Sequence, residues 1–280
     1  MKRVTMEING FSTCWDGAEG TNIETLTEKL CLAGAAELIP NPQEDYAAFK
    51  TVLSHSFPKM RIFNLNLGGD SVAFSIVDEK TVDGNWNGSQ EIRAYLVGGS
   101  VFLDPADEPL ADMLTQRFAW EKKIVPASKM GQVLTRAVRE LKGVSERSRG
   151  GTYWLQADKQ ERWEEIAQAV EAANTGFAIY IKETAHSPNT IRSVCSSLMK
   201  EVQTELDVIA EDLADGGAGA VLLRNRQATA LELLSKVEEY EEILDDKREE
   251  LDNNIAGIQA MLAAALLAVE AEKEAKRNAS

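Results

Sequence analysis

The sequence predicts an α+β protein in three parts: a small antiparallel sheet domain at 1–125, a small helix–hairpin–helix–strand module at 126–185, and an antiparallel coiled-coil arm at 186–280. Three observations lead to this prediction. Short β-rich runs follow one another between residues 61 and 103, and helices alternate with short strands in the middle of the chain. In the last third, apolar residues recur at helical spacing.

The N-terminal segment is expected to hold one short strand and two helices. Residues 4–8 form a β-rich run. Thr21-Asn22 can cap a helix that continues to about Ala33, because their side-chain oxygens can accept the free N–H groups of a first helical turn. Pro40-Asn41-Pro42 then breaks the chain before a second short helix over 43–54.

A three- or four-stranded antiparallel sheet is expected next. Gly68-Gly69-Asp70 lies between the first two β-rich runs and is typical of a hairpin turn. Residues 83–88 are polar and are expected to form a longer loop before the third run. The runs are 61–67, 72–77, 91–97 and, as an edge strand, 101–103.

Helical and β-rich segments alternate after this sheet. A helix is expected from Pro109 to Trp120, and Gly143 is expected to end the next one, since glycine is favoured just past a helix C-terminus. The elements of the middle module are a helix over 126–141, a hairpin of 144–147 and 152–156, a helix over 158–173 and a strand over 177–182.

The last third is expected to form two long helices that fold back on each other. Helical spacing of apolar residues covers 187–213 and about 222–275, with a short glycine-rich turn at 215–219 between them. A short turn joins helices that lie antiparallel and side by side. In the second helix, eleven positions at alternating spacings of three and four form the expected seam: Leu234, Val237, Glu241, Leu244, Arg248, Leu251, Ile255, Ile258, Leu262, Ala265 and Val269. Only Glu241 and Arg248 among them are charged, a pattern typical of a coiled coil.

The predicted interface of this coiled coil consists of large apolar residues that face each other. They are Leu198, Val202, Leu206 and Ile209 on the first helix and Leu251, Ile255, Ile258 and Leu262 on the second. The alanine-rich segment 260–268 extends beyond the reach of the shorter first helix. An apolar face without cover commonly finds one on another copy, so the sequence predicts a homo-oligomer.

Charge is unevenly distributed along the chain, whose net charge is −15. From Ser187 onward ten Lys and Arg stand against nineteen Asp and Glu, which favours a solvated acidic surface, or a negative face that competes with nucleic acid for a partner's basic groove. Residues 120–150 reverse the sign, with eight basic residues against three acidic ones. The candidate nucleic-acid contacts in this basic segment are Lys129, Arg136, Arg139, Lys142, Arg147 and Arg149.

A helix followed by a basic two-stranded wing is how winged-helix proteins meet DNA phosphates. Arg136 and Arg139 are three residues apart and therefore share a helix face. The alternative, which we favour, is that these arginines pair with carboxylates of Glu161, Glu164, Glu165 or the acidic arm.

No catalytic, metal or cofactor site is expected. His55 and His186 lie in predicted loops beside serines, with no carboxylate in view to orient them. The glycine pairs lack the spacing of a phosphate loop or a dinucleotide fingerprint, and the acidic pairs of the arm favour a solvated face over a metal site. Cys14, Cys31 and Cys195 are odd in number and widely spaced, which favours a reducing cytoplasm. Neither a membrane-spanning run nor a signal peptide is expected.

Two segments resemble a known group of proteins. They are Arg149-Gly150-Gly151-Thr152-Tyr153-Trp154, followed by a helix and a strand, and Tyr240-Glu241-Glu242-Ile243-Leu244 late in a long helix. This pattern is similar to an uncharacterised family of bacteriophage and prophage proteins with an N-terminal α/β part and a helical C-terminus. The resemblance covers the C-terminal half. It implies a viral origin and the cytoplasm of an infected bacterium, where accessory proteins of this kind are often interaction proteins, including inhibitors of host defence complexes.

The sequence therefore predicts a non-enzymatic interaction protein that homo-oligomerises and scaffolds or inhibits another protein complex. It is expected to need no cofactor and to contact no membrane. The second hypothesis is a nucleic-acid-binding protein that uses residues 129–149, and the third is an enzyme of unknown type.

Overall fold

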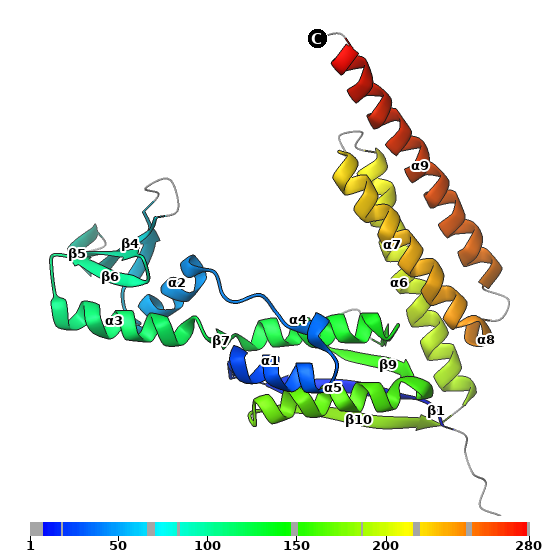
Figure 1. Ribbon diagram of the computed structural model, residues 1–280, viewed down its shortest axis with the longest axis horizontal. Helices are drawn as coiled ribbons and strands as arrows, with labels where there is room; N and C mark the ends of the chain where they lie inside the picture. The colour runs from blue at the N-terminus through cyan, green and yellow to red at the C-terminus, as the bar shows by residue number, and fades with distance from the viewer. Residues whose placement is uncertain are drawn as a thin grey trace, which may run out of the picture. The chain divides into compact units, whose positions relative to one another are not determined.

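The computed structural model confirms an α+β protein with antiparallel sheets. The structure describes residues 8–17, 19–65, 71–82, 85–146, 151–185, 187–214, 219–244 and 248–278. The chain forms two compact units, each built from segments that are far apart in the sequence (Figure 1). The first unit comprises Met1–Asp16, Leu134–Ala167 and Ala178–Ser280, and the second comprises Gly17–Val133 and Gln168–Phe177. The units therefore do not divide at residues 125 and 185.

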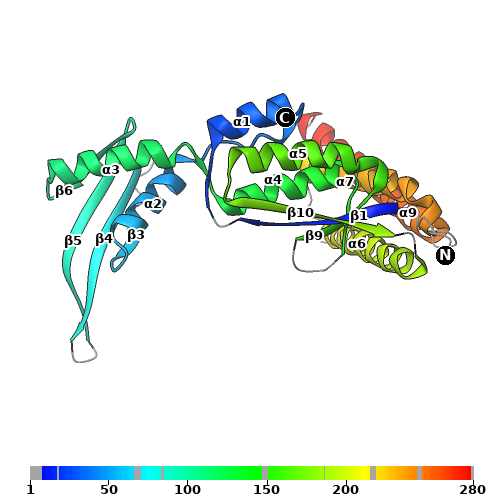
Figure 2. The same ribbon diagram turned by 90° about the horizontal axis from the view of Figure 1, so that it is seen from below.

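The second unit is built around a four-stranded antiparallel sheet whose strands lie in sequence order. The strands are β3 (Arg61–Asn64), β4 (Val72–Val82), β5 (Asn85–Val97) and β6 (Ser100–Asp104). Their register places Phe74 opposite Ala94 and Ala94 opposite Leu103, so these buried side chains share one face. On that face they pack with residues of α2 (Asp45–Ser56) and α3 (Glu108–Glu121) (Figure 2).

The prediction of a loop over 83–88 is wrong for residues 85–88. β5 begins at Asn85, and residues 85–88 pair with residues 79–82 of β4. Asp-Gly is a preferred two-residue hairpin sequence, and threonine, valine and tryptophan beside it favour strands, so pairing extends up to residues 83 and 84. These two residues, like the predicted hairpin turn at 68–70, lie outside the described residues.

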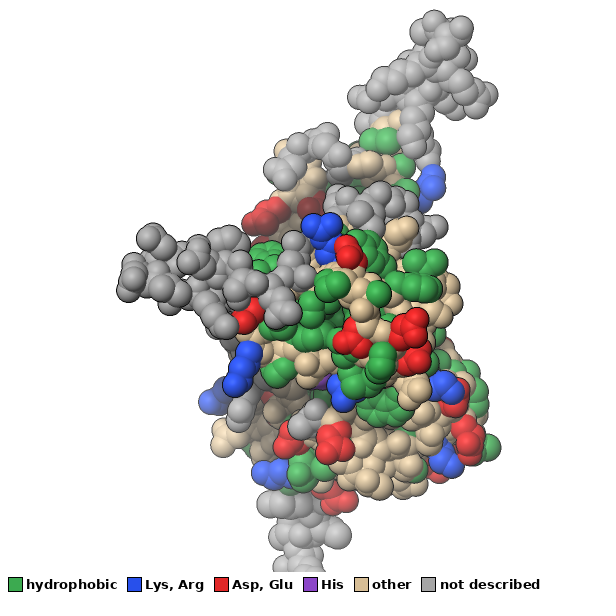
Figure 3. All heavy atoms as spheres, turned by 90° about the vertical axis from the view of Figure 1, so that its left-hand side faces the viewer, with side chains coloured by type: hydrophobic (Ala, Val, Ile, Leu, Met, Phe, Trp, Pro, Cys, Tyr) green, Lys and Arg blue, Asp and Glu red, His purple; other side chains and the backbone are tan. Residues whose placement is uncertain are grey.

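The opposite face of this sheet reaches the surface at β6. Val101 and Leu103 are buried, whereas Phe102 between them is 55% exposed, because successive side chains of a strand point to opposite faces. Figure 3, which views the left-hand side of Figure 1, shows hydrophobic side chains at the surface between charged ones. The helices thus cover one sheet face, and Phe102 belongs to the other.

Short elements complete the second unit. They are β2 (Thr21–Asn22), α1 (Ile23–Leu32), η1 (Ala36–Leu38) and β7 (Ile124–Val125), and β2 pairs with β7. The expected cap of α1 is confirmed: Asn22 Oδ1 accepts the backbone N–H groups of Glu24 and Thr25 at 2.9 and 3.1 Å.

The sheet of the first unit is completed by the N-terminal strand. Its strands, in spatial order, are β10 (Phe177–Ala185), β1 (Ile8–Gly17), β9 (Thr152–Gln156) and β8 (Val144–Ser145). β1 pairs antiparallel with β9, with Phe11 opposite Leu155. Residues 4–7 of the strand expected at 4–8 lie outside the described residues, and β1, which starts at Ile8, joins the middle module.

Two buried tryptophans explain why β1 joins this sheet. The indole N–H of Trp163 donates to the buried Thr13 Oγ1 of β1 at 3.0 Å. The indole N–H of Trp154 donates to Thr184 Oγ1 of β10 at 2.9 Å, and the Thr184 hydroxyl in turn donates to the backbone oxygen of Gly10 of β1 at 2.9 Å. A buried indole needs such an acceptor. The helical elements of the module are α4 (Ala127–Glu140), η2 (Ala157–Lys159) and α5 (Gln160–Ala173).

The C-terminal arm contains three long helices and one short one. They are α6 (Pro188–Ala214), α7 (Ala220–Glu239), α8 (Glu241–Leu244) and α9 (Arg248–Asn278), and α9 packs against both α6 and α7 (Figure 1). The single helix expected over 222–275 is therefore wrong. The described break is at Tyr240, between α7 and α8, directly before the charged seam position Glu241, which pairs with the other charged seam position, Arg248. A coiled-coil seam must be buried along its length, so two charges seven residues apart interrupt it.

The residues of the predicted helical interface lie in two hydrophobic clusters. The first contains Leu198, Val202, Leu206, Leu251 and Ile255. The second contains Ile209 and Leu262, and the half-buried Ile258 packs against both. α7 adds Leu233 and Val237 to the first cluster and Leu223 and Ala230 to the second. The second half of the arm therefore contributes two helices, α7 and α9, to packing that the sequence analysis assigned to one.

Candidate functional site

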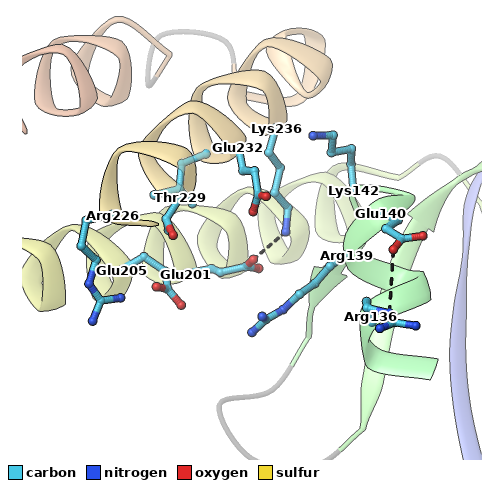
Figure 4. Close-up of a pocket in the computed structure, with 11 residues that line it drawn as sticks. Arg136, Arg139, Glu140, Lys142, Glu201, Glu205, Arg226, Thr229, Glu232 and Lys236 are labelled. Carbon is cyan, nitrogen blue, oxygen red and sulfur yellow. Dashed lines mark hydrogen bonds and ion pairs between the residues drawn. The ribbon is translucent and has the colours of Figure 1, made fainter. Parts of the chain in front are cut away.

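A cavity of about 660 Å³ lies within the first unit, between the C-terminal end of α4 and the helices α6 and α7 (Figure 4). Its walls are strongly charged. Arginines and a lysine come from the α4 side, and carboxylates come mainly from α6 and α7. The volume falls in the range of small-molecule sites, about 300–1,000 Å³.

Lys236 of α7 is the buried charge of this cavity, with 6% of its surface exposed. Its ammonium Nζ donates to Glu201 Oε1 of α6 and to the backbone oxygen of Gly143, both at 2.6 Å. Burial lowers the pKa of Lys236; Glu201 opposes this effect, and the positive charges of Arg139 and Lys142 add to it. The ammonium thus joins α7 to α6 and to the loop that follows α4.

Tyr240 fixes the same end of α7. Its ring is buried and lies 5.9 Å from the ring of Trp154, between centroids, and its hydroxyl donates to the backbone oxygen of Lys142 at 2.9 Å. Burial is the main cause that raises the pKa of the Tyr240 phenol, and the negative charge of Glu239 is the next. Both polar residues that anchor α7 therefore reach backbone oxygens next to the cavity.

The structure gathers three of the six candidate basic residues at this cavity. Arg136, Arg139 and Lys142 line its α4 side. Lys129 belongs to the second unit, where its Nζ lies 3.5 Å from the backbone oxygen of Asn41. Arg147 and Arg149 lie outside the described residues.

Some of the carboxylates expected as partners have other contacts. Arg136 Nε lies 3.9 Å from Glu140 Oε1, within its own helix. Of the carboxylates proposed as partners, Glu165 pairs with Arg162 at 2.9 Å and Glu164 Oε1 accepts a hydrogen bond from Gln160 at 2.8 Å. Among the described residues, Arg139 and Lys142 have no ion-pair partner.

The residues that sequence analysis missed are Glu201, Lys236 and Tyr240. A signal for two of them was present: Leu233, Lys236, Val237 and Tyr240 follow the i, i+3, i+4, i+7 spacing of a buried helix face. A lysine in such a stripe needs a buried partner. The sequence does not show that Glu201, on a different helix, is that partner.

A second surface lies on α9. Residues 255–269 contain no charged side chain. One stripe of this segment faces α6 and α7, with Ile255 and Leu262 buried, while Met261 and Leu267 are 52% and 68% exposed. A helix that is apolar on all sides is normally buried on all sides. Here the described residues leave the side of the segment with Met261 and Leu267 uncovered.

The described residues offer little else of chemical character. No group of three or more His, Cys, Asp or Glu among them could hold a metal ion. His55 lies in the last turn of α2 rather than in a loop, and His186 lies outside the described residues. Cys14, Cys31 and Cys195 are free thiols. None of the described helices is both long and apolar enough to span a membrane.

One family matches the chain, over residues 69–273, and it is described as a family of unknown function, DUF6744. The chain belongs to this family. The DUF6744 match begins just before β4, ends within α9, and so includes the cavity and residues 255–269. No curated protein and no solved structure matches the chain.

Proposed function

We propose that this DUF6744 protein is a non-enzymatic interaction protein that self-associates and binds another protein complex through its helical arm. The observation that supports this proposal is the uncovered side of residues 255–269. Met261 and Leu267 are large apolar side chains that stay more than half exposed on a segment without charge. Apolar surface of this kind is typical of protein–protein contacts.

The acidic character of the chain supports the choice of this surface for self-association. Two copies of a chain with net charge −15 repel each other over most of their surfaces. An uncharged segment allows close approach without that repulsion. The proposal includes the expectation that the helices of the arm pair as an antiparallel coiled coil.

Nucleic-acid binding is less well supported. Arg136 pairs with Glu140, and Glu201, Glu205 and Glu232 line the same cavity as the basic residues of α4. A nucleic acid carries a phosphate at every nucleotide, so a backbone held by those basic residues would bring its neighbouring phosphates up to these carboxylates, which repel them.

The resemblance to phage and prophage proteins extends the proposal to a setting. It implies a bacterial cytoplasm and a host complex as the target, with defence complexes as the first class to test. The scaffolding or inhibition of such a complex would need no catalytic group in this chain.

Light scattering of the purified full chain at micromolar concentration tests self-association, and a multiple of the single-chain mass is expected. The double variant Met261→Glu/Leu267→Glu should reduce the mass to that of one chain, because charges on a desolvated apolar contact are unfavourable. Val221→Glu is the matched control, since Val221 of α7 is 74% exposed but lies outside residues 255–269. A single-chain mass for the wild type would refute the proposed self-association.

Capture from bacterial lysate with the same three proteins tests partner binding. A complex identified by mass spectrometry should be retained by the wild type and by Val221→Glu, and lost with Met261→Glu/Leu267→Glu. Equal capture by all three proteins would place the partner contact outside residues 255–269.

A further inference from the structure

The α4 end of the cavity holds more positive charge than its neighbours neutralise. The charges that act on the Lys236 ammonium are those of Glu201, Arg139 and Lys142. Glu201 is bonded to Lys236 itself, and Arg139 and Lys142 have no ion-pair partner among the described residues. Arg139 and Lys142 therefore lie beside the buried Lys236–Glu201 ion pair without a counter-charge among the described residues, although the chain as a whole is acidic.

Among the described residues, no carboxylate of the cavity forms an ion pair with Arg139 or Lys142. Glu140 lies 3.9 Å from Arg136, and Arg226 pairs with Asp212 at 2.6 Å. Glu205 and Glu232 remain on the α6 and α7 side. In Figure 4, Glu205 lies beside Arg226, at the end of the cavity away from Lys142.

The backbone at Lys142 adds a geometric observation. Lys142 adopts φ of 60°, in the left-handed region that favours glycine, although Gly143 is the next residue. Gly143 is required at its own position, because an added Cβ would lie 2.5 Å from Val138 Cγ1 and 3.2 Å from the backbone oxygen of Val138. The left-handed position is thus occupied by a lysine whose side chain lines the cavity (Figure 4).

We propose that this cavity binds a small polar anion, with a phosphate or carboxylate group held between Arg139 and Lys142 and Lys236 behind them. The planar guanidinium of Arg139 can bind two oxygens of such a group, and the ammonium of Lys142 binds as a point charge. Lys236 has three N–H donors, of which Glu201 and Gly143 use two. Glu205 and Glu232 accept hydrogen bonds from hydroxyl or amino groups on the rest of the ligand. This site does not depend on self-association of the arm.

Thermal unfolding in inorganic phosphate, at constant ionic strength set with chloride, tests the site. Phosphate should raise the melting temperature of the wild type in a saturable manner. Arg139→Gln/Lys142→Gln should weaken the apparent phosphate affinity by about tenfold or more, since it removes both free cations. Arg139 is exposed and Lys142 half-buried, so this variant should keep the fold, which circular dichroism checks.

The control is Arg192→Gln/Arg224→Gln, which removes the same charge from exposed positions on α6 and α7 outside the cavity. It should retain the phosphate response. An absent response in the wild type, or equal responses in both double variants, would overturn the proposal.

The same measurements with acetate compare a carboxylate with a phosphate, and either response supports the site if Arg139→Gln/Lys142→Gln removes it. A short DNA duplex at equal phosphate concentration separates a free anion from a nucleic-acid backbone. Stronger binding of the duplex, lost in Arg139→Gln/Lys142→Gln, would replace the small-anion site by a nucleic-acid site.

Discussion

The arm is held in different ways at its base, where α7 ends beside α4, and along residues 255–269 of α9. At the base, Lys236 of α7 and Tyr240, which directly follows α7, are buried, and each donates to a backbone oxygen near the end of α4. Along α9, residues 255–269 have no charge and bury only one side, through side chains such as Leu262.

The hydrogen bonds at the base depend strongly on geometry, whereas the apolar contacts along α9 do not. Hydrogen bonds of a buried ammonium or phenol require one geometry, because a misplaced donor leaves a buried group unpaired. Apolar contacts are non-directional, so the exposed side chains of residues 255–269 do not impose one geometry on a partner that packs against them. We therefore expect the base to determine how the arm leaves the module, and residues 255–269 to remain available to a partner.

The largest expected effect comes from breaking the ion pair at the base. Glu201→Ala should lower the free energy of unfolding by about 3 kcal/mol, because it leaves the Lys236 ammonium buried without a counter-charge. This value is at the low end for buried pairs, since 29% of the Glu201 side chain stays exposed. Urea unfolding of the purified variant measures it.

The double variant Glu201→Met/Lys236→Met is the control for this prediction. It removes both charges and keeps apolar volume, so it should lose less stability than Glu201→Ala despite changing more atoms. A double variant less stable than the single one would show that the hydrogen bonds of Lys236 to the backbone matter more than its pairing.

Adjacent residues of α9 give the next largest contrast. Leu262→Ala should cost about 2–3 kcal/mol, because Leu262 is fully buried in the second cluster. Met261→Ala should change the stability by less than about 0.5 kcal/mol, since Met261 is 52% exposed. Both are measured by thermal unfolding at concentrations low enough to keep the chain monomeric. Equal losses would contradict the one-sided burial of residues 255–269.

The parts of the fold that the sequence predicted are those with local partners. β3 to β6 form a sheet in sequence order, so each strand pairs with a neighbour that lies close to it in the sequence. The cap of α1 at Asn22 needs only the next three residues. The pairing of β1 with β9 was not predictable in this way, because no feature of residues 8–17 specifies a partner beyond residue 150.

The residues of the candidate site likewise differ in whether their partners are close in the sequence. Arg136, Arg139 and Lys142 stood out because they are close together in the sequence and share a charge. Glu201 and Lys236 did not, because their pairing joins two helices that only the folded chain brings together. The break after α7 at Tyr240 was missed although the charged seam position Glu241 follows it, since helical periodicity continues on both sides.

A smaller effect is expected at the phenol of Tyr240. Tyr240→Phe keeps the ring and removes the donor to Lys142, so it should cost about 1 kcal/mol at neutral pH. Burial first, then the charges of Glu239, Glu201 and Asp158, raise the pKa of Tyr240 above its ordinary value of 10.0. The unfolded chain therefore releases this proton first, and the free energy of unfolding of the wild type should fall as pH rises above 10.0.

The contribution of Lys236 to the free energy of unfolding changes with pH in the opposite direction. Its lowered pKa makes the unfolded chain bind the proton more strongly, so its contribution to stability rises with pH below 10.5. Both proteins contain Lys236, and the difference between wild type and Tyr240→Phe isolates the phenol. Urea unfolding at increasing alkaline pH should show the wild-type advantage shrinking. A constant advantage would mean that the phenol ionises equally in the folded and unfolded chains.

The smallest expected effect has the opposite sign and concerns Gly257 of α9. Gly257→Ala should raise the free energy of unfolding by about 0.5–1 kcal/mol, because glycine in a helix interior is unfavourable and an added Cβ meets no atom within 4 Å. Asn254→Ala, one turn earlier and exposed, is the control, since it also improves helix propensity but lies outside residues 255–269. If a second copy packs against the uncovered side of this segment, Gly257→Ala should weaken self-association in light scattering while Asn254→Ala leaves it unchanged. Equal association of both variants and the wild type would show that the contact between copies does not include Gly257.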